Sequence, residues 1–407
     1  YIISILSAGS PDACSELSTS LARIMFPYIV FSAILSFTMG YLNSHGSFFA
    51  PAFAPVMLNI SVITGIISGE YFLSQPVYGA AYGLLAGGII QLLLQAPYMI
   101  KYGFRLRVRI DFRNPDLVRV FRTMLPAVFG IGAYQINAMT GNLLAAMIRE
   151  GSASYIYYTN RLTELVTGVF IVSIGSAVFP GMSRDAVSSD PEGLERVVLS
   201  SVTLALFLAV PAAAGLMMLG VPVASVLFMR GDFTYGDSVM LSHSLFYAAG
   251  GMVFVAIQRV LVQAFYTLQN TAVPVAAAFV SVALNVPLSF FLMNTSLAHG
   301  GIALAGALAA MVQALILVAC YKLSAGSLAV RTAGLSLIKY FLSAAGMSVF
   351  VCYASGFVDW REGPFAGRGT ALALIIALGA MIYFLCCLAL RDEVMLRVIK
   401  RRGRMKD

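Results

Sequence analysis

The sequence predicts an all-α fold, a polytopic membrane helical bundle with two pseudo-symmetric six-helix lobes, the first incomplete, and an extra C-terminal helix pair. Composition is the first reason, since 59% of the 407 residues are hydrophobic and only 11% are charged, whereas a soluble domain has about 25% charged residues. Apolar runs of about 20 residues, the length of a membrane-spanning helix, are the second reason. An internal repeat is the third, because residues 40–95 recur loosely about 222–226 positions later.

Eleven apolar runs are long enough to cross a bilayer. We expect them to be helices, because hydrocarbon offers no hydrogen-bond partner to an open backbone. Residues 1–8 look like the end of a further span. In chain order, the expected spans are 21–42, 54–73, 77–100, 123–148, 153–179, 197–220, 240–266, 272–293, 299–321, 334–357 and 369–390.

A few identities carry the repeat. The segment at residues 41–43, followed by Pro51, is answered by the segment at residues 266–269, followed by Pro274. Three spans separate the two copies, so the repeat unit has six spans and both units cross the membrane in the same orientation. This predicts a pseudo-twofold axis along the membrane normal and a cavity between two lobes. The first unit would need three spans before residue 21, and we expect that most of these precede this sequence.

The spans and the repeat divide the chain into three expected parts. Residues 1–110 form the remainder of an N-terminal lobe, with about three spans and a stub. Residues 111–330 form a C-terminal six-span lobe. Residues 331–407 form an additional two-span pair with a basic tail.

Basic residues predict the orientation of the chain in the membrane. The 101–122 loop holds seven Lys and Arg residues, and the tail after the last span holds seven more, whereas the loops of the opposite side hold four. Positive loops stay in the cytoplasm, so we expect a cytoplasmic C-terminus and an outward-facing segment at residues 9–20. The net charge of +8 then reflects topology and anionic lipid headgroups, and we expect no nucleic-acid partner.

The residues that carry enzyme or metal chemistry are few and scattered. Three His and five Cys residues show no metal-ligand spacing, and no Ser-His-Asp or paired-carboxylate arrangement is recognisable. The Cys residues are typical of buried small apolar side chains. We therefore expect no cofactor, no metal and no enzyme activity.

Charged side chains inside a span are rare and usually functional. Arg161 and Glu164 lie three residues apart in the polar, aromatic segment at residues 157–164, so they share a helix face and can pair. One interpretation is a structural ion pair that positions the helix. The preferred interpretation is that Arg161 faces a water-filled cavity and binds an anionic group, because the guanidinium fork donates two parallel hydrogen bonds to phosphate.

Other polar residues within spans are weaker candidates. Arg259 has no acid in its own span, so it needs a partner from another helix or from a ligand. Together with Arg161 it could suit a pyrophosphate. Gln135, Asn137 and Asn142 lie in one region of span 123–148. Hydrogen bonds between helices are their favoured role, with substrate contact as the alternative.

Three segments resemble one known family. Residues 51–60 read PAFAPVMLNI, residues 157–162 read YYTNRL and residues 265–271 read FYTLQNT. They are similar to the MurJ (MviN) lipid II flippases of the multidrug/oligosaccharidyl-lipid/polysaccharide exporter superfamily, and the resemblance runs along essentially the whole chain. It implies fourteen spans, two six-helix lobes with a cationic central cavity, and a C-terminal pair that forms a groove for a lipid tail.

The resemblance also implies roles for residues. Arg161 matches an arginine that the family requires. An acid often precedes that arginine, and here the position is Asn160, so an ion pair at that position does not carry over. Spans 123–148 and 272–293 contain no acid that could match the sodium ligands of some members, and sodium coupling is therefore not supported.

The function that the resemblance implies is transport. We expect a lipid II flippase of the bacterial inner membrane that serves cell-wall synthesis. We expect it to bind undecaprenyl-pyrophosphate-linked disaccharide-peptide and membrane lipids and to work as a monomer. One alternative is a cation-coupled multidrug antiporter or another polysaccharide-lipid flippase of the superfamily. A membrane glycosyltransferase is less favoured, because no acidic catalytic residues or soluble domain are evident.

Overall fold

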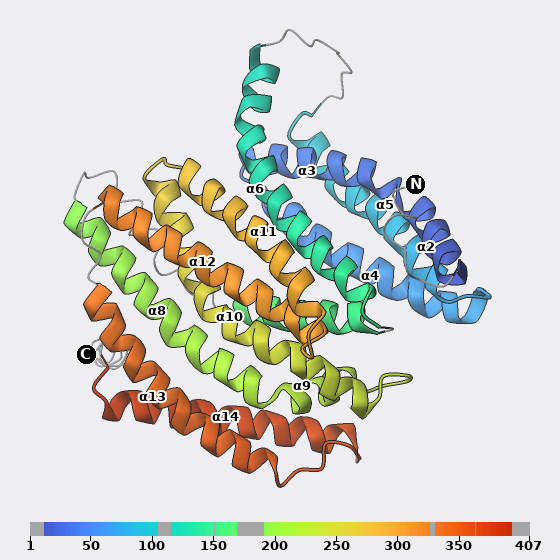
Figure 1. Ribbon diagram of the computed structural model, residues 1–407. Helices are drawn as coiled ribbons and strands as arrows, with labels where there is room; N and C mark the ends of the chain where they lie inside the picture. Colours follow the sequence, from blue (N-terminus) through green and yellow to red (C-terminus); the bar gives the residue numbers. More distant parts are fainter. Residues whose placement is uncertain are drawn as a thin grey trace, which may run out of the picture. The chain divides into compact units, whose positions relative to one another are not determined.

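A computed structural model describes residues 12–104, 115–149, 151–168, 191–325, 330–362 and 364–392 (Figure 1). The described residues form helices and contain no strand, as the sequence predicted. A further helix, which carries no label in the figure, covers residues 152–168. The labelled helices are α2 (Asp12–Met25), α3 (Tyr28–Ser44), α4 (Phe49–Phe72), α5 (Val77–Lys101), α6 (Pro115–Ala146), α8 (Pro191–Met218), α9 (Gly220–Phe228), α10 (Tyr235–Thr267), α11 (Ala272–Met293), α12 (His299–Ala325), α13 (Val330–Ser355) and α14 (Phe365–Ala389).

Nine stretches of helix within the described residues are long and apolar enough to cross a membrane. They coincide with nine of the eleven expected spans. The other two expected spans, 123–148 and 153–179, are represented by α6 and by the helix at 152–168. Residues 169–179, the stub at 1–8 and the basic tail beyond residue 392 lie outside the described residues.

Prolines explain where the helices differ from the expected spans. The first expected span is divided into α2 and α3 at Pro27, whose nitrogen has no hydrogen to donate to the preceding turn. The short helix α9 was not predicted. It follows a break at Leu219 and carries Pro222 in its first turn, where a missing donor is tolerated.

The chain forms two compact units, Tyr1–Pro115 and Asp116–Asp407. In the first unit, α4 and α5 approach so closely that a Cβ atom on Gly65 or Gly79 would meet the backbone of the other helix. Two polar contacts join α5 to its neighbours, the first to α3 and the second to α4. The Thr38 hydroxyl donates to Gln95 Oε1 at 2.6 Å, and Gln91 donates to the Ala54 carbonyl at 2.9 Å.

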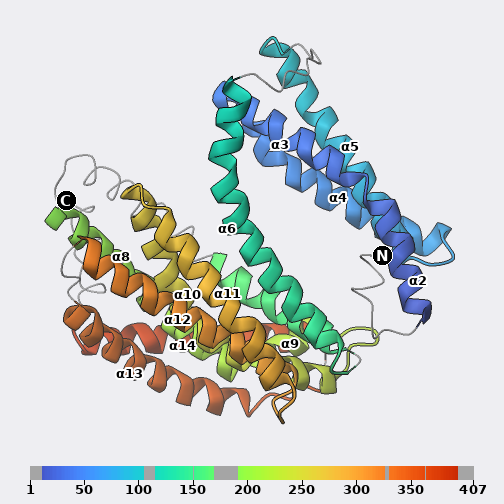
Figure 2. The ribbon, with the colours of Figure 1, turned by 45° about the horizontal axis from the view of Figure 1, so that its top comes forward.

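The second unit contains both the expected six-span lobe and the additional helix pair. Its core surrounds α8 and α10, and the α13–α14 pair lies along α8 and α9 in both views of the ribbon (Figures 1 and 2). The Tyr383 hydroxyl of α14 donates to the Phe207 carbonyl of α8 at 2.8 Å, so the pair is joined to the lobe by a buried hydrogen bond as well as by apolar packing.

The two expected copies of the repeat share one feature of their backbone geometry. Gly46 follows α3 with a φ of 74°, and Gln269, 223 positions later, follows α10 with a φ of 57°. The amide after each donates to the carbonyl five residues earlier, from Ser47 to Leu42 and from Asn270 to Phe265, each at 2.9 Å. Both helices therefore end in the same left-handed turn, after which α4 and α11 begin at equivalent positions.

Candidate functional site

The helix at residues 152–168 has two unlike faces. Tyr155, Thr159 and Leu162 are buried in the second unit, because apolar and small side chains recur at the spacing of one helix face. Tyr157, Asn160, Arg161 and Glu164 are exposed on the other side. We call these four residues the polar stripe.

Two hydrogen bonds fix the buried face of this helix to α10. The Tyr155 hydroxyl donates to Asp237 Oδ1 at 2.5 Å, and the Thr159 hydroxyl donates to Ser244 Oγ at 3.2 Å. The later residue of this helix contacts the later residue of α10, so the two helices run parallel to each other. The polar stripe therefore projects away from α10.

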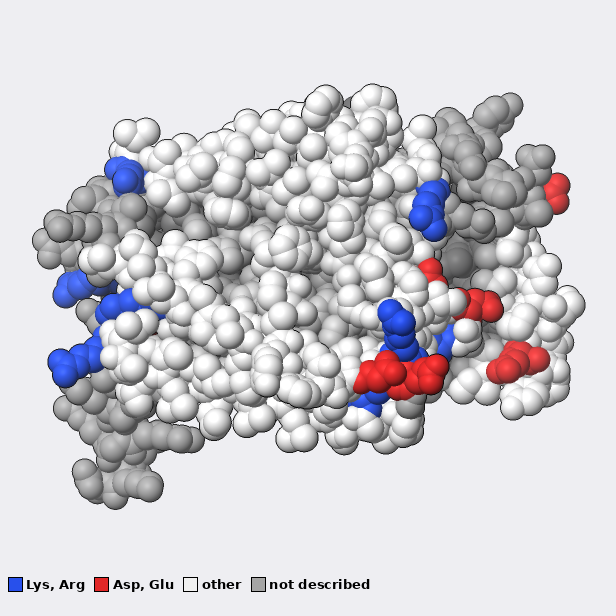
Figure 3. Space-filling model, turned by 60° about the horizontal axis from the view of Figure 1, so that its bottom comes forward, with Lys and Arg blue, Asp and Glu red and all other residues white. Residues whose placement is uncertain are grey.

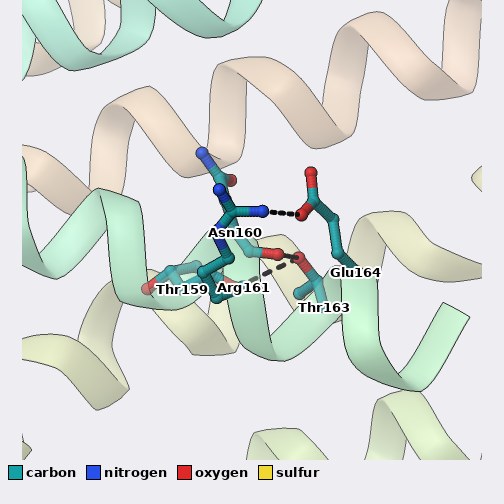
Figure 4. A network of polar contacts seen from close by, with 5 residues as sticks. All are labelled: Thr159, Asn160, Arg161, Thr163 and Glu164. Atoms are coloured by element: carbon teal, nitrogen blue, oxygen red, sulfur yellow. Dashed lines mark hydrogen bonds and ion pairs between the residues drawn. The ribbon is translucent and has the colours of Figure 1, made fainter. Parts of the chain in front are cut away.

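The polar stripe contains an ion pair. Arg161 Nη1 donates to Glu164 Oε2 at 2.9 Å, and the two side chains are 60% and 45% exposed. Figure 4 shows both side chains on the same side of the helix, with Asn160 beside them. The Tyr157 ring centroid lies 5.0 Å from Arg161 Cζ, within the range of a cation–π contact. Sequence analysis assigned no role to this ring, although its spacing of four residues from Arg161 would have indicated the contact.

Such a stripe is unfavourable next to hydrocarbon. Charged side chains at membrane depth face a bundle interior or a water-filled cavity, and an exposed ion pair contributes only about 0–1 kcal/mol by itself. The pair therefore does little for the stability of the helix. Its guanidinium retains N–H donors beyond the one that Glu164 accepts, and these can bind an anion.

Arg259 lies far from Arg161 along the direction in which the two helices run. Arg259 is exposed on α10, and at about 1.5 Å per residue it lies about 22 Å beyond Ser244 along that helix. Arg161 is two residues from Thr159, which contacts Ser244. The structure therefore does not bring Arg161 and Arg259 together at one level, because their positions along the two helices are much farther apart than two phosphoryl groups.

The polar residues of α6 divide into two groups. Gln135 is exposed, and its part in substrate binding stays a prediction. Asn285 of α11 donates to Asn137 Oδ1, and Ser289 donates to Asn285 Oδ1 at 3.2 Å. This network joins α6 to α11, as the favoured interpretation of hydrogen bonds between helices predicted for Asn137.

An apolar cavity lies where the additional pair meets the lobe. Its volume is about 320 Å³, and it is lined by side chains of α8, α9, α13, α14 and the helix at 152–168. Phe207, Pro211, Met347 and Tyr383 are among the lining residues. The single polar atom of the Tyr383 side chain is used in its bond to Phe207, so the cavity suits a hydrocarbon chain.

Comparison with known proteins identifies the family. The family model described as "Lipid II flippase MurJ" matches residues 1–368. The chain belongs to the MurJ family. The resemblance seen in residues 51–60, 157–162 and 265–271 is thereby confirmed.

Curated MurJ relatives are longer than this chain. "Probable lipid II flippase MurJ" of Vibrio cholerae is 32% identical over 289 residues, which are 71% of this chain and 55% of the relative. The protein of the same description from Bdellovibrio bacteriovorus is 34% identical over 334 residues, 82% of this chain and 64% of the relative. The chain therefore spans between about half and two thirds of the length of these two MurJ proteins.

Solved structures support the MurJ fold. "Lipid II flippase MurJ, inward closed conformation" has a TM-score of 0.76 at 24% identity, covering 95% of this chain and 78% of that structure. A structure described as an inward-facing multidrug resistance MATE family transporter of the MOP superfamily has a TM-score of 0.69 at 18% identity, covering 80% and 75%. The expected all-α membrane bundle is confirmed.

Proposed function

We propose that this chain is the greater part of a flippase that moves the lipid II headgroup from the cytoplasmic to the outer leaflet by alternating access. The exposed polar stripe of the helix at 152–168 carries the proposal. It puts a guanidinium on the surface of an otherwise apolar lobe, where only water or a polar substrate makes it favourable.

The physical task explains why a guanidinium is needed. A pyrophosphate headgroup must cross about 30 Å of hydrocarbon, and burial of its charge without compensation would cost tens of kcal/mol. A hydrated path in which Arg161 donates two hydrogen bonds to a phosphoryl group removes much of that cost. Asn160 offers a further amide on the same stripe, and Glu164 holds the guanidinium when no substrate is bound.

Arg259 and Gln135 have separate roles in this proposal. Arg259 lies at another level of the lobe and would contact the headgroup at another stage of its passage, not together with Arg161. Gln135 is an exposed hydrogen-bonding side chain on α6 and would bind the sugar or peptide part of the headgroup, which is rich in hydroxyl and amide groups.

The apolar cavity between α8 and α14 would hold part of the undecaprenyl tail. It has apolar walls and a volume of about 320 Å³, so a hydrocarbon segment gains there the contacts that it leaves in lipid. The phosphoryl end would then be near water while the tail stays in an apolar environment.

Charge supports the proposed orientation. Figure 3 shows basic residues at one end of the face it presents, mixed charges at the other, and few charges between them. Lys339 donates to the Arg391 carbonyl at 3.3 Å, so the first half of α13 and the end of α14 lie at the same end of this helix pair. Asp359, Arg361 and Glu362 connect the other ends of these helices. The positive end would be cytoplasmic.

The protein would act as a monomer in the bacterial inner membrane, without catalysing a reaction on the lipid and without a nucleic-acid partner. A cation-coupled antiporter is less well supported, because Glu164, the acid of the polar stripe, is held by Arg161 at 2.9 Å. Transport of cationic drugs in place of lipid II would favour that alternative.

The test is reconstitution of the full-length natural protein in vesicles with labelled lipid II on one side. Arg161→Ala should abolish the appearance of the headgroup on the other side, and Arg361→Ala, which removes an arginine at the end of the α13–α14 pair, should retain it. Equal transport by Arg161→Ala and wild type would refute the role of the polar stripe. Absence of lipid II transport by the wild-type protein would refute the function.

A further inference from the structure

The guanidinium of Arg161 is held from two sides by residues of its own helix. Glu164, three residues later, accepts a hydrogen bond from Nη1 at 2.9 Å. Tyr157, four residues earlier, has its ring centroid 5.0 Å from Cζ. Tyr157 also forms a side-chain hydrogen bond with Arg161. The guanidinium has five N–H donors, so donors remain for a ligand, and the ring face attracts the cation without using any of them.

Tyr157 is itself supported by the core of the second unit. Its ring meets that of Tyr158 edge to face, with centroids 5.7 Å apart. Tyr158 in turn stacks on Phe228 of α9 at 4.4 Å and meets Phe233 edge to face at 6.0 Å. A continuous row of rings thus leads from buried structure to the guanidinium, although Tyr157 itself is 47% exposed.

We propose that Tyr157 is a positioning residue that orients Arg161 for the phosphoryl group of its substrate. An arginine side chain is long and has many rotamers, so an unsupported guanidinium must be ordered when substrate binds. Tyr157 orders it in advance, and the guanidinium still has N–H donors for the substrate. Glu164 can give way to the substrate phosphate as the acceptor, while the contact with the ring persists.

This role rests on the proposed function, because it assumes that a phosphorylated lipid is the ligand of Arg161. It adds a specific expectation, which is that Tyr157 acts on substrate affinity through Arg161, both by its ring face and by the side-chain hydrogen bond between the two residues. A purely structural tyrosine would instead affect folding and leave the affinity for substrate unchanged.

Tyr157→Leu and Tyr157→Phe in the full-length protein separate these possibilities. Lipid II transport in vesicles gives a maximum rate and a half-saturating lipid II concentration for each variant. We expect Tyr157→Leu to raise the half-saturating concentration about two- to fivefold, the range that an exposed cation–π contact gives. Tyr157→Phe keeps the ring and loses the hydrogen bond of the hydroxyl, so its half-saturating concentration should lie between those of Tyr157→Leu and wild type. Tyr353→Leu, at an exposed tyrosine of α13, is the matched control and should stay close to wild type.

Binding of lipid II to the detergent-solubilised protein gives a second measurement that does not depend on transport. Tyr157→Leu should weaken binding by the same factor, and this factor should vanish when Arg161→Gln is already present, because the ring then has no cation to orient. Should Tyr157→Leu fail to fold, Tyr157→Met serves as a longer apolar replacement.

The outcomes are distinct. Wild-type affinity and transport in Tyr157→Leu would overturn the positioning role and leave the proposed function intact. A wild-type protein that neither binds nor transports lipid II would overturn the proposed function and this inference together.

Discussion

The Tyr155 hydroxyl donates to Asp237 Oδ1 at 2.5 Å and so joins the helix that carries Arg161 to the start of α10. Asp237 also accepts from the Thr234 amide at 2.7 Å and from the Thr234 hydroxyl at 2.6 Å, as part of a capping box. One carboxylate thus caps the first turn of α10 and fixes the neighbouring helix. This contact therefore helps to fix the position of the polar stripe along α10.

Tyr155→Phe should therefore destabilise the second unit without removing the cap. A hydrogen bond to a charged group contributes about 1.5–3 kcal/mol, and the loss should fall at the low end because Asp237 keeps its Thr234 contacts. The expected effect is a lower apparent Tm of the purified protein in detergent, by a few degrees. Tyr158→Phe, three residues later, is the control. An unchanged Tm in Tyr155→Phe would mean that this bond contributes nothing to stability.

At the two equivalent turns, removing a glycine should destabilise the protein and introducing one should stabilise it. Gly46 and Gln269 both have positive φ, a conformation that costs an L-residue about 1–2 kcal/mol. No atom lies within 4 Å of a Cβ placed on Gly46, so Gly46→Ala should be destabilising through its backbone alone. Gln269→Gly should instead raise the apparent Tm. Thermal melts of both variants test this, and a stabilising Gly46→Ala would contradict the assigned turn.

The apolar pattern of the sequence was sufficient to predict the helices, because in a membrane every span must be both apolar and helical. It was not sufficient at Pro27 and Leu219, where two helices follow each other within one apolar segment. Hydropathy does not distinguish a continuous span from an interrupted one, and α9 was missed for this reason.

The polar stripe was only partly predictable. Arg161 and Glu164 stood out because charges are rare in the spans, and their spacing was enough to indicate the ion pair that the structure contains. The separation of Arg161 and Arg259 was not predictable, because it depends on which residues of two parallel helices contact each other. The apolar cavity was unpredictable as well, since its walls come from segments more than 200 positions apart.

Cross-linking tests the levels of the two helices. The hydroxyl oxygens of Thr159 and Ser244 are 3.2 Å apart, so cysteines at both positions should form a disulfide after mild oxidation. Cysteines at positions 161 and 259 should not, because about 20 Å separates their levels by helix rise. The natural Cys residues should first be replaced by Ser, and mass spectrometry of proteolytic peptides then detects the bond. A disulfide between positions 161 and 259 would restore the idea that both arginines grip one pyrophosphate.

Filling the apolar cavity should affect the lipid tail and not the headgroup. Ala212 lines the cavity, so Ala212→Phe places a ring in the space proposed for hydrocarbon. We expect slower transport of lipid II that carries the full undecaprenyl chain, by about tenfold if roughly 1.4 kcal/mol of apolar contact is lost. An analogue with a much shorter chain should be transported at nearly the wild-type rate, because it does not need the cavity. Leu165→Phe, at an exposed position on the helix at 152–168, controls for added bulk. Equal slowing of both lipids by Ala212→Phe would show that the substitution distorts the lobe and that the cavity does not hold the tail.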